Sequence, residues 1–307
     1  MTSQDFLEGI VVRAHGGHYY VELDSAPADL IDCGLRGRLK QDVASSDLVA
    51  VGDRVRIRLL SENRGIIEEI LPRRSVLSRC PPLPRPQIEQ VIVANVDLVL
   101  AVFSIASPPL NPFMLDRYLM ACELEELEVT IVANKMDLVQ SQRQTRILGL
   151  YEGIGYRVVR TSAITTEGLP ALRELMRNRL TVLTGPSGTG KSTLLNALWP
   201  HLDLETGEIS AFHDRGTHTT VVPRLLRPEP GICVTDTPGL RQFRLWNVEP
   251  KDLDNLFPEM RPYLSECRFS PCSHIHEPGC AVKAAVERGQ ISKTRYESYC
   301  RVYAHGF

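Results

Sequence analysis

The chain has 307 residues, 43% of them hydrophobic and 23% charged, which is ordinary globular composition and excludes a disordered chain. Its formal net charge is only −2, so overall charge does not indicate a nucleic-acid-binding protein, and any basic surface must come from local clustering. The first residues carry no cationic segment, and Asn95 and Asp97 interrupt the most apolar run. We therefore expect a cytoplasmic protein with no membrane partner. A monomer is also expected, although no residue pattern indicates the oligomeric state.

Residues 1–72 are predicted to form a small antiparallel β-barrel. Short β-rich runs alternate there with Gly- and Asp-containing turns, at residues 9–13, 18–23, 53–60 and 64–70. Arg54, Arg56 and Arg58 alternate with apolar residues, so the two-residue period of a strand places all three on one face. This row is either a solvated strand face or the RNA-binding surface of an oligonucleotide-binding (OB-like) barrel.

A stiff basic linker is predicted next, over residues 73–88. Residues 72–86 contain five prolines and four arginines but no acidic residue.

Residues 89–246 are predicted to form an α/β domain, because apolar runs alternate with helical patterns. This alternation is typical of a parallel sheet with helices on both faces. Strands are expected over residues 96–103, 129–133, 157–161, 180–184, 219–226 and 231–235, and helices near residues 112–127, after Asp137, near 169–179 and after the phosphate loop described next.

Residues 185–192 form a complete G-x-x-x-x-G-K-S motif between an apolar strand and a helical run. In such a phosphate loop, backbone amides surround the phosphate oxygens, Lys191 reaches the β and γ phosphates, and Ser192 binds Mg²⁺. Lys191 is thus predicted to be catalytic. The predicted nucleotide-binding residues of this segment are Gly185, Pro186, Ser187, Gly188, Thr189, Gly190, Lys191, Ser192 and Thr193.

The base is predicted from an N-K-x-D motif, Asn134, Lys135, Met136 and Asp137, at the end of an expected strand. A carboxylate such as that of Asp137 accepts two hydrogen bonds from guanine, and adenine offers no such donor pair. Together with the phosphate loop, the motif indicates GTP. Ser162 and Ala163 match the S-A element that supports the guanine oxygen.

Asp236 begins a D-T-P-G motif in which the aspartate holds Mg²⁺ through water and the amide of Gly239 senses the γ-phosphate. Either Thr219 or Thr220 completes the Mg²⁺ shell, and we favour Thr220. The next residue after Gly239 is Leu240, which cannot position water, so His218 is the candidate for that role. An exposed loop histidine is the alternative.

These motifs run in a rotated order, with base recognition before the phosphate loop. Because each follows the carboxyl end of a parallel strand, one crevice still results. The chain continues from Gly239 into the C-terminal segment, so we hypothesise that nucleotide state moves that segment.

Residues 247–307 are predicted to form a small, mainly helical zinc-binding domain. Cys267, Cys272, His274 and Cys280 supply three thiolates and one imidazole, the closed ligand set of a structural zinc site. His276 and Cys300 are spare candidates.

With these motifs in this order, the chain resembles the RsgA (YjeQ/YloQ) family of circularly permuted GTPases. The resemblance implies an oligonucleotide-binding barrel, a permuted GTPase domain and a zinc domain that act in late maturation of the small (30S) ribosomal subunit, which stimulates hydrolysis. It also implies that Arg54, Arg56 and Arg58 contact ribosomal RNA and that His218 is catalytic. Thr217 departs from the family's usual arginine, and Leu240 from its frequent phenylalanine.

Two other functions remain open from the sequence. One is a nucleotide-gated RNA-binding module in which hydrolysis is incidental, and the other is a translation or tRNA factor with the same domains.

Overall fold

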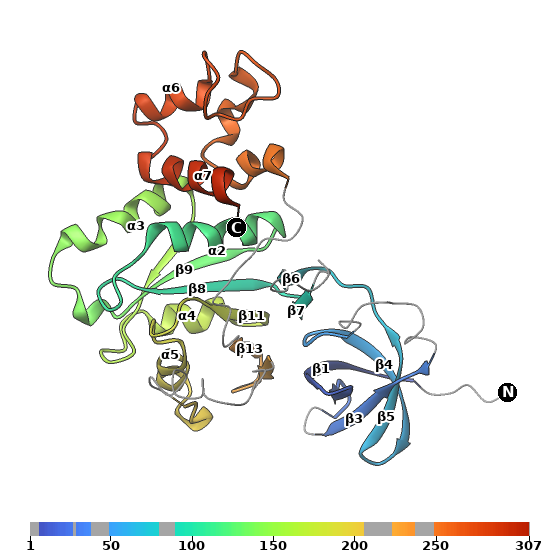
Figure 1. The fold of residues 1–307 in the computed structure, drawn as a ribbon. Coiled ribbons are helices and arrows are strands. Elements are labelled where there is room, and N and C mark those ends of the chain that lie inside the picture. Colours follow the sequence, from blue (N-terminus) through green and yellow to red (C-terminus); the bar gives the residue numbers. More distant parts are fainter. Residues whose placement is uncertain are drawn as a thin grey trace, which may run out of the picture.

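The structure, a computed structural model, describes residues 6–26, 29–37, 49–79, 90–205, 223–236 and 249–306. A β-barrel, an α/β unit and a mainly helical C-terminal part follow one another along the chain (Figure 1). The predicted three-part fold is therefore confirmed.

Five strands form the barrel: β1 (Leu7–His15), β2 (His18–Leu23), β3 (Leu30–Leu35), β4 (Arg54–Ser61) and β5 (Arg64–Ile70). They pair in the closed order β1-β2-β3-β5-β4-β1 around buried valine and isoleucine side chains. The predicted antiparallel barrel is antiparallel at every pairing except one, because β3 and β5 pair in parallel. The sequence also did not reveal β3, since Asp32 and Gly34 are unfavourable strand residues that interrupt its pattern.

The α/β unit contains a parallel sheet in the order β10-β9-β8-β11-β13. Its strands are β8 (Leu98–Ser104), β9 (Val129–Asn134), β10 (Arg157–Arg160), β11 (Arg179–Thr184) and β13 (Ile232–Asp236). Every residue of β8 is buried, as expected for a central strand covered on both faces. A short antiparallel strand, β12 (Arg224–Leu226), extends the sheet beyond β13 and coincides with the end of the strand predicted over residues 219–226.

Helices cover both faces of this sheet (Figure 1). On one face lie α2 (Pro112–Leu124) and α3 (Gln142–Ile154), and on the other lie α4 (Leu169–Leu175) and α5 (Lys191–Leu198). Short 3-10 helices, η1 (Met136–Leu138) and η2 (Pro200–Leu202), follow β9 and α5. None of the described helices combines the length and the apolar character that crossing a membrane requires.

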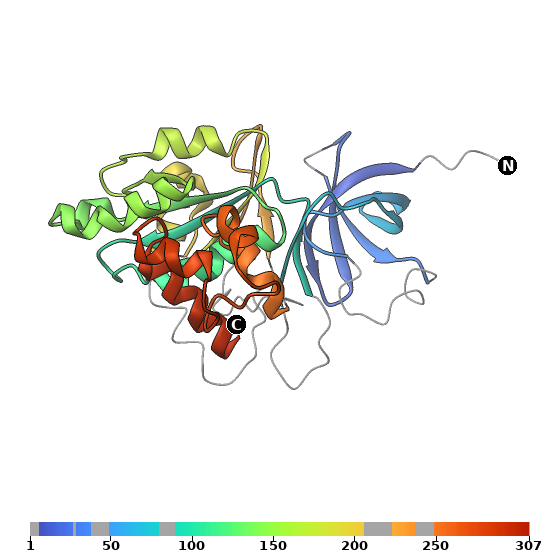
Figure 2. The same cartoon turned by 90° about the horizontal axis from the view of Figure 1, so that it is seen from above.

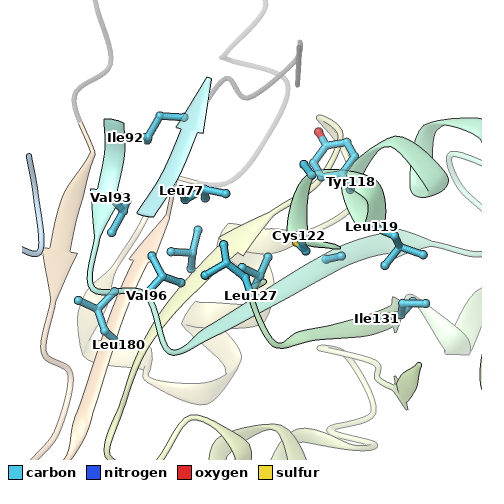
Figure 3. Close-up of a cluster of buried hydrophobic side chains, with 14 of the residues drawn as sticks. Leu77, Ile92, Val93, Val96, Tyr118, Leu119, Cys122, Leu127, Ile131 and Leu180 are labelled. Atoms are coloured by element: carbon cyan, nitrogen blue, oxygen red, sulfur yellow. The ribbon is translucent and has the colours of Figure 1, made fainter. Parts of the chain in front are cut away.

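The hairpin of β6 (Val76–Arg79) and β7 (Gln90–Ala94) belongs to the core of the α/β unit. Leu77 and Val93 of the hairpin pack in one cluster with Val96, Tyr118 and Leu180 (Figure 3). Part of the stretch predicted as a linker is therefore a buried strand, while the proline-rich residues 80–89 lie outside the described residues.

The barrel is hydrogen-bonded to the α/β unit beside it (Figure 2). β1 pairs with β12 where Arg13 lies opposite Arg224, so barrel and sheet are continuous. At Gly52, φ is +90°, and a Cβ would lie 2.2 Å from the carbonyl oxygen of Ala94. Only glycine permits this close approach.

The C-terminal part consists of η4 (Pro250–Leu256), η5 (Arg261–Glu266), α6 (Ala281–Glu287) and α7 (Lys293–His305). The guanidinium of Arg295 on α7 is fully buried, and its Nη1 lies 2.7 Å from Oδ1 of Asp116 on α2. Glu259 accepts from Nε of Arg295 at 2.6 Å, and the Tyr151 hydroxyl donates to Asp116 at 2.7 Å. This buried network holds the C-terminal part against α2.

Candidate functional site

The phosphate loop connects β11 to α5, as the motif predicts. At Gly185, φ is +142°, and a Cβ there would lie 2.1 Å from the carbonyl oxygen of Val102. At Gly190, φ is +89°, and a Cβ would lie 2.7 Å from Nδ2 of Asn134. These glycines let the loop pass close to its neighbours with its backbone turned sharply before the helix.

Lys191 is the first residue of α5, and its side chain turns back over the loop. Its Nζ donates to the carbonyl oxygens of Gly185 at 2.9 Å and Pro186 at 3.0 Å. The ammonium group therefore lies against the backbone of the loop, the segment whose amides would surround a bound phosphate. Ser192 and Thr193 follow in the first turn of α5, and the hydroxyl of Thr189 closes the loop by donating to Pro186 at 3.0 Å.

The base motif begins at the end of β9, next to the phosphate loop. Nδ2 of the buried Asn134 donates to the carbonyl oxygen of Thr189 at 2.9 Å, and its Oδ1 accepts from Thr161 Oγ1 at 3.0 Å. Lys135 has φ of +61°, and its Nζ donates to the carbonyl oxygen of Gly188 at 2.7 Å. The structure thus brings together two motifs that the sequence separates.

Asp137 and Ser162, the predicted guanine-binding residues, are in direct contact with each other. The Ser162 hydroxyl donates to Oδ1 of Asp137 at 2.6 Å and accepts from the amides of Ile164 and Thr165. Because Asp137 is exposed and Ser162 is fully buried, the serine fixes a carboxylate that stays accessible to a ligand. Met136 and Ala163 lie within the two segments that present these groups.

Asp236 ends β13 opposite Leu183 of β11, so the D-T-P-G motif begins beside the strand that leads into the phosphate loop. The predictions for Gly239, His218, Thr219 and Thr220 lie outside the described residues. The roles assigned to them therefore stay predictions.

Sequence reasoning missed one contact with the base motif. Nζ of Lys135 also donates to the carbonyl oxygen of Ser107 at 2.7 Å, and the amide of Ser107 donates to Oγ of the buried Ser104 at 2.9 Å. The segment after β8 therefore supplies a second backbone acceptor for Lys135, in addition to the one from the phosphate loop. The Ser-Pro-Pro stretch predicts a turn, but nothing in the sequence relates that turn to Lys135.

Cys267, Cys272, His274 and Cys280 meet in the C-terminal part, with all four potential ligand atoms within 4.8 Å of one another. This arrangement can hold a metal ion, as predicted. His276 is exposed, and among the described residues neither it nor Cys300 belongs to the cluster. The hydroxyls of Tyr296 and Tyr299 on α7 donate to the carbonyl oxygens of His274 and Ser273, which supports the loop between the ligands.

The arginine row lies on one face of β4, as the alternation predicts. Each guanidinium is paired with carboxylates: Arg54 with Asp24 and Glu8, Arg56 with Glu8 and Glu69, and Arg58 with Glu68. The row is therefore charge-balanced within the barrel, although each side chain stays partly exposed. Its role toward RNA stays a prediction.

Comparison with known proteins agrees with this geometry. The family model of the RsgA N-terminal domain matches residues 8–67, and that of the RsgA GTPase matches residues 70–246. The Small ribosomal subunit biogenesis GTPase RsgA of Gemmatimonas aurantiaca is 44% identical over 96% of this chain and 95% of its own length. The protein of the same name from Moorella thermoacetica is 41% identical, with 95% of each chain covered.

Two solved structures are similar along nearly the whole length. YjeQ from Thermotoga maritima superposes with a TM-score of 0.80 and 34% identity, covering 98% of this chain and 99% of its own. YloQ, described as a circularly permuted GTPase, gives a TM-score of 0.74 and 30% identity, covering 100% and 97%. By sequence, motif order and fold, the chain belongs to the RsgA GTPase family.

Proposed function

We propose that this protein hydrolyses GTP to GDP and phosphate and acts in late maturation of the small (30S) ribosomal subunit. The observation that carries guanine-nucleotide binding is the direct hydrogen bonding of Asn134 and Lys135 to the phosphate loop. A base site and a phosphate site joined in this way can bind the base and the phosphates of a single nucleotide. The relatives named as small-subunit biogenesis GTPases support the choice of partner.

Different residues of the site are proposed to bind the base, stabilise charge and position water in GTP hydrolysis. Asp137, oriented by Ser162, accepts hydrogen bonds from guanine, while Lys191 and the amides of the phosphate loop stabilise negative charge on the transferred phosphoryl group. Mg²⁺, for which Ser192 and Thr220 are the proposed ligands and Asp236 a water-mediated one, supplies further charge neutralisation. His218 is proposed to position the attacking water, and the amide of Gly239 to sense the γ-phosphate.

Zinc is the metal proposed for the C-terminal cluster. Three thiolates and one imidazole match its preferred ligands, and four protein ligands leave no open position for water. The ion would therefore stabilise the fold and take no part in hydrolysis. We also propose domains at residues 1–72, 89–246 and 247–307, with residues 73–88 as a connecting segment whose strand β6 packs on the α/β unit. A monomeric state and a cytoplasmic location are proposed as well.

Arg54, Arg56 and Arg58 are proposed to contact ribosomal RNA. Their side chains are 35%, 42% and 34% exposed, respectively, so phosphate groups can approach them despite their carboxylate partners. The paired carboxylates would then be released or reoriented as RNA binds.

Phosphate release from GTP tests the proposed function, with the purified protein alone and with small subunits, large subunits or bare RNA at fixed salt. Stimulation by small subunits alone supports the maturation GTPase, and Lys191→Ala should abolish the signal in every mixture. Equal stimulation by all additions would contradict the proposed partner and favour a translation or tRNA factor. A His218→Ala variant that no longer hydrolyses GTP but still binds to and leaves the small subunit at the normal rate would favour a nucleotide-gated RNA-binding module.

A further inference from the structure

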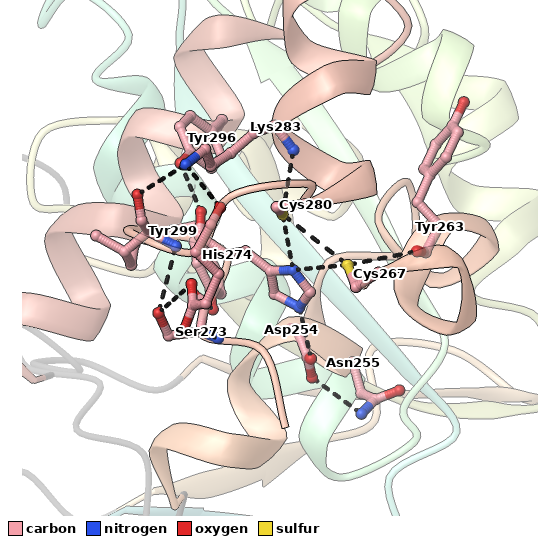
Figure 4. Close-up of polar contacts among 12 residues, drawn as sticks. Asp254, Asn255, Tyr263, Cys267, Ser273, His274, Cys280, Lys283, Tyr296 and Tyr299 are labelled. Carbon is pink, nitrogen blue, oxygen red and sulfur yellow. Dashed lines mark hydrogen bonds and ion pairs between the residues drawn. The ribbon is translucent and has the colours of Figure 1, made fainter. Parts of the chain in front are cut away.

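A carboxylate contacts His274, one of the four potential metal ligands in the C-terminal part. Oδ2 of Asp254, on η4, is 3.1 Å from Nε2 of His274 (Figure 4). The other ring nitrogen, Nδ1, lies 3.3 Å from Sγ of Cys280 and 3.5 Å from Sγ of Cys267. The imidazole therefore has one nitrogen turned to the thiols and the other to the carboxylate.

These distances identify the ligand atom of His274. Zinc–sulfur and zinc–nitrogen bonds of ~2.3 and ~2.0 Å place tetrahedral ligand atoms about 3.5 to 3.8 Å apart. The two Nδ1–Sγ separations are close to this range, and Sγ of Cys267 and Sγ of Cys280 are 3.9 Å apart. Nδ1 is thus the nitrogen that faces the metal position.

The second nitrogen of such an imidazole needs a hydrogen-bond acceptor. A neutral histidine that binds metal through Nδ1 carries its proton on Nε2, and burial of that N–H without a partner is costly. His274 is only 1% exposed, so water is a poor substitute. Oδ2 of Asp254 accepts a hydrogen bond from this N–H, while its Oδ1 accepts one from Nδ2 of Asn255 at 3.0 Å.

We propose that Asp254 is a positioning residue for the metal site: it fixes the tautomer and orientation in which His274 presents Nδ1 to the ion. This inference rests on the proposed zinc site. A charged acceptor also increases the electron density that the imidazole offers to a metal.

The same contact connects the metal site to the rest of the fold. Leu253 and Leu256 flank Asp254 on η4 and pack in one apolar cluster with Met120 of α2. The helix η4 follows residues 237–248, which connect it to β13 and Asp236. Loading of the ion would therefore stabilise the position of η4 on the α/β unit.

The test uses the full-length protein with Asp254→Asn, which keeps an uncharged acceptor, and Asp254→Ala, which removes the acceptor. Asp252→Asn is the matched control, because Asp252 is an exposed acid on the same 3-10 helix. Zinc affinity is measured by competition with a chromogenic chelator, and ligand geometry by the absorption spectrum of the cobalt-substituted protein. Thermal unfolding is followed with and without zinc.

Asp254→Ala should weaken zinc binding by roughly 10- to 100-fold, as loss of such hydrogen-bond partners does, and should alter the cobalt spectrum. Asp254→Asn should weaken zinc binding less than Asp254→Ala does, and Asp252→Asn should bind zinc with wild-type affinity. The unfolding temperature should fall for the zinc-loaded Asp254→Ala protein and stay unchanged for the zinc-free one.

Wild-type zinc affinity in Asp254→Ala would overturn the inference. An equal fall in unfolding temperature with and without zinc would also overturn it, because Asp254 would then act only in packing. A wild-type protein that binds no zinc would refute the zinc proposal and the inference together, and GTP hydrolysis measured in the same sample would show whether the proposed GTPase activity stands.

Discussion

Nζ of Lys135 donates a hydrogen bond of 2.7 Å to the carbonyl oxygen of Gly188, 53 residues further along the chain. This contact joins the base motif to the phosphate loop although the base motif comes first in the sequence. The two motifs follow the carboxyl ends of β9 and β11, the parallel strands on either side of β8, so the order in which the chain visits the strands does not change the crevice they form.

Lys135→Met should weaken the binding of GTP and GDP alike. The change removes charged hydrogen bonds to the carbonyl oxygens of Gly188 and Ser107, worth about 1.5 to 3 kcal/mol each in typical proteins. Titration with fluorescent GDP and GTP analogues measures both affinities, with the exposed Lys251→Met as control. A loss confined to GTP would contradict a role in supporting the loop for both nucleotides.

Arg295→Met should destabilise the protein by about 3 to 5 kcal/mol, because it leaves the buried carboxylate of Asp116 without its charged partner. Equilibrium denaturation measures the loss, and Arg288→Met, at an exposed position in the same part of the chain, is the control. Unchanged stability would contradict the buried ion pair.

This pair also limits how the C-terminal part can respond to nucleotide. The hypothesis that nucleotide state moves this part now requires that the Arg295–Asp116 contact either breaks or moves together with α2. Small-angle scattering of the GDP-bound and GTP-analogue-bound protein, with and without Arg295→Met, compares these cases.

Cys33 should not react with iodoacetamide in the folded protein at pH 8. Burial, followed by the charge of Asp32, raises the pKa of this barrel thiol to about 12, so it stays protonated until the pH far exceeds that of the assay. Peptide mapping by mass spectrometry should show modification only after denaturation. Rapid alkylation of the native protein would contradict the closed barrel.

Replacing Arg54, Arg56 and Arg58 by glutamine should reduce the salt dependence of small-subunit binding. Each phosphate contact that is lost lowers the slope of log affinity against log salt by about one. Arg143→Gln on α3, an exposed arginine outside the barrel, is the control. An unchanged slope would mean that the row pairs only with its own carboxylates.

The sequence was sufficient to predict the site wherever chemistry imposes a local motif. The glycines at 185 and 190, the N-K-x-D residues and the four candidate metal ligands are such positions, because backbone clearance, base recognition and ligand number restrict both residue type and spacing. Strands with strong apolar character, such as β8 and β11, were also predictable.

The remaining features depend on approaches between distant parts of the chain. Asp32 and Gly34 are unfavourable strand residues, so the sequence did not predict β3. This strand is stabilised by pairing with β2 on one side and β5 on the other. The pairing of Arg13 with Arg224, the Ser107 contact of Lys135 and the Asp254 contact of His274 each join segments without any shared motif. Only the packed fold reveals them.

The most direct test of the account is a change of base specificity at Asp137. In the proposed site the carboxylate accepts hydrogen bonds from guanine donors, whereas xanthine carries a carbonyl where guanine carries its amino group, and an amide side chain can donate to it. In a phosphate-release assay with GTP, ATP and XTP, the wild type should hydrolyse GTP, and Asp137→Asn should lose GTP turnover and gain turnover of XTP. Unchanged GTP preference in Asp137→Asn, or equal use of ATP by the wild type, would contradict the assigned site.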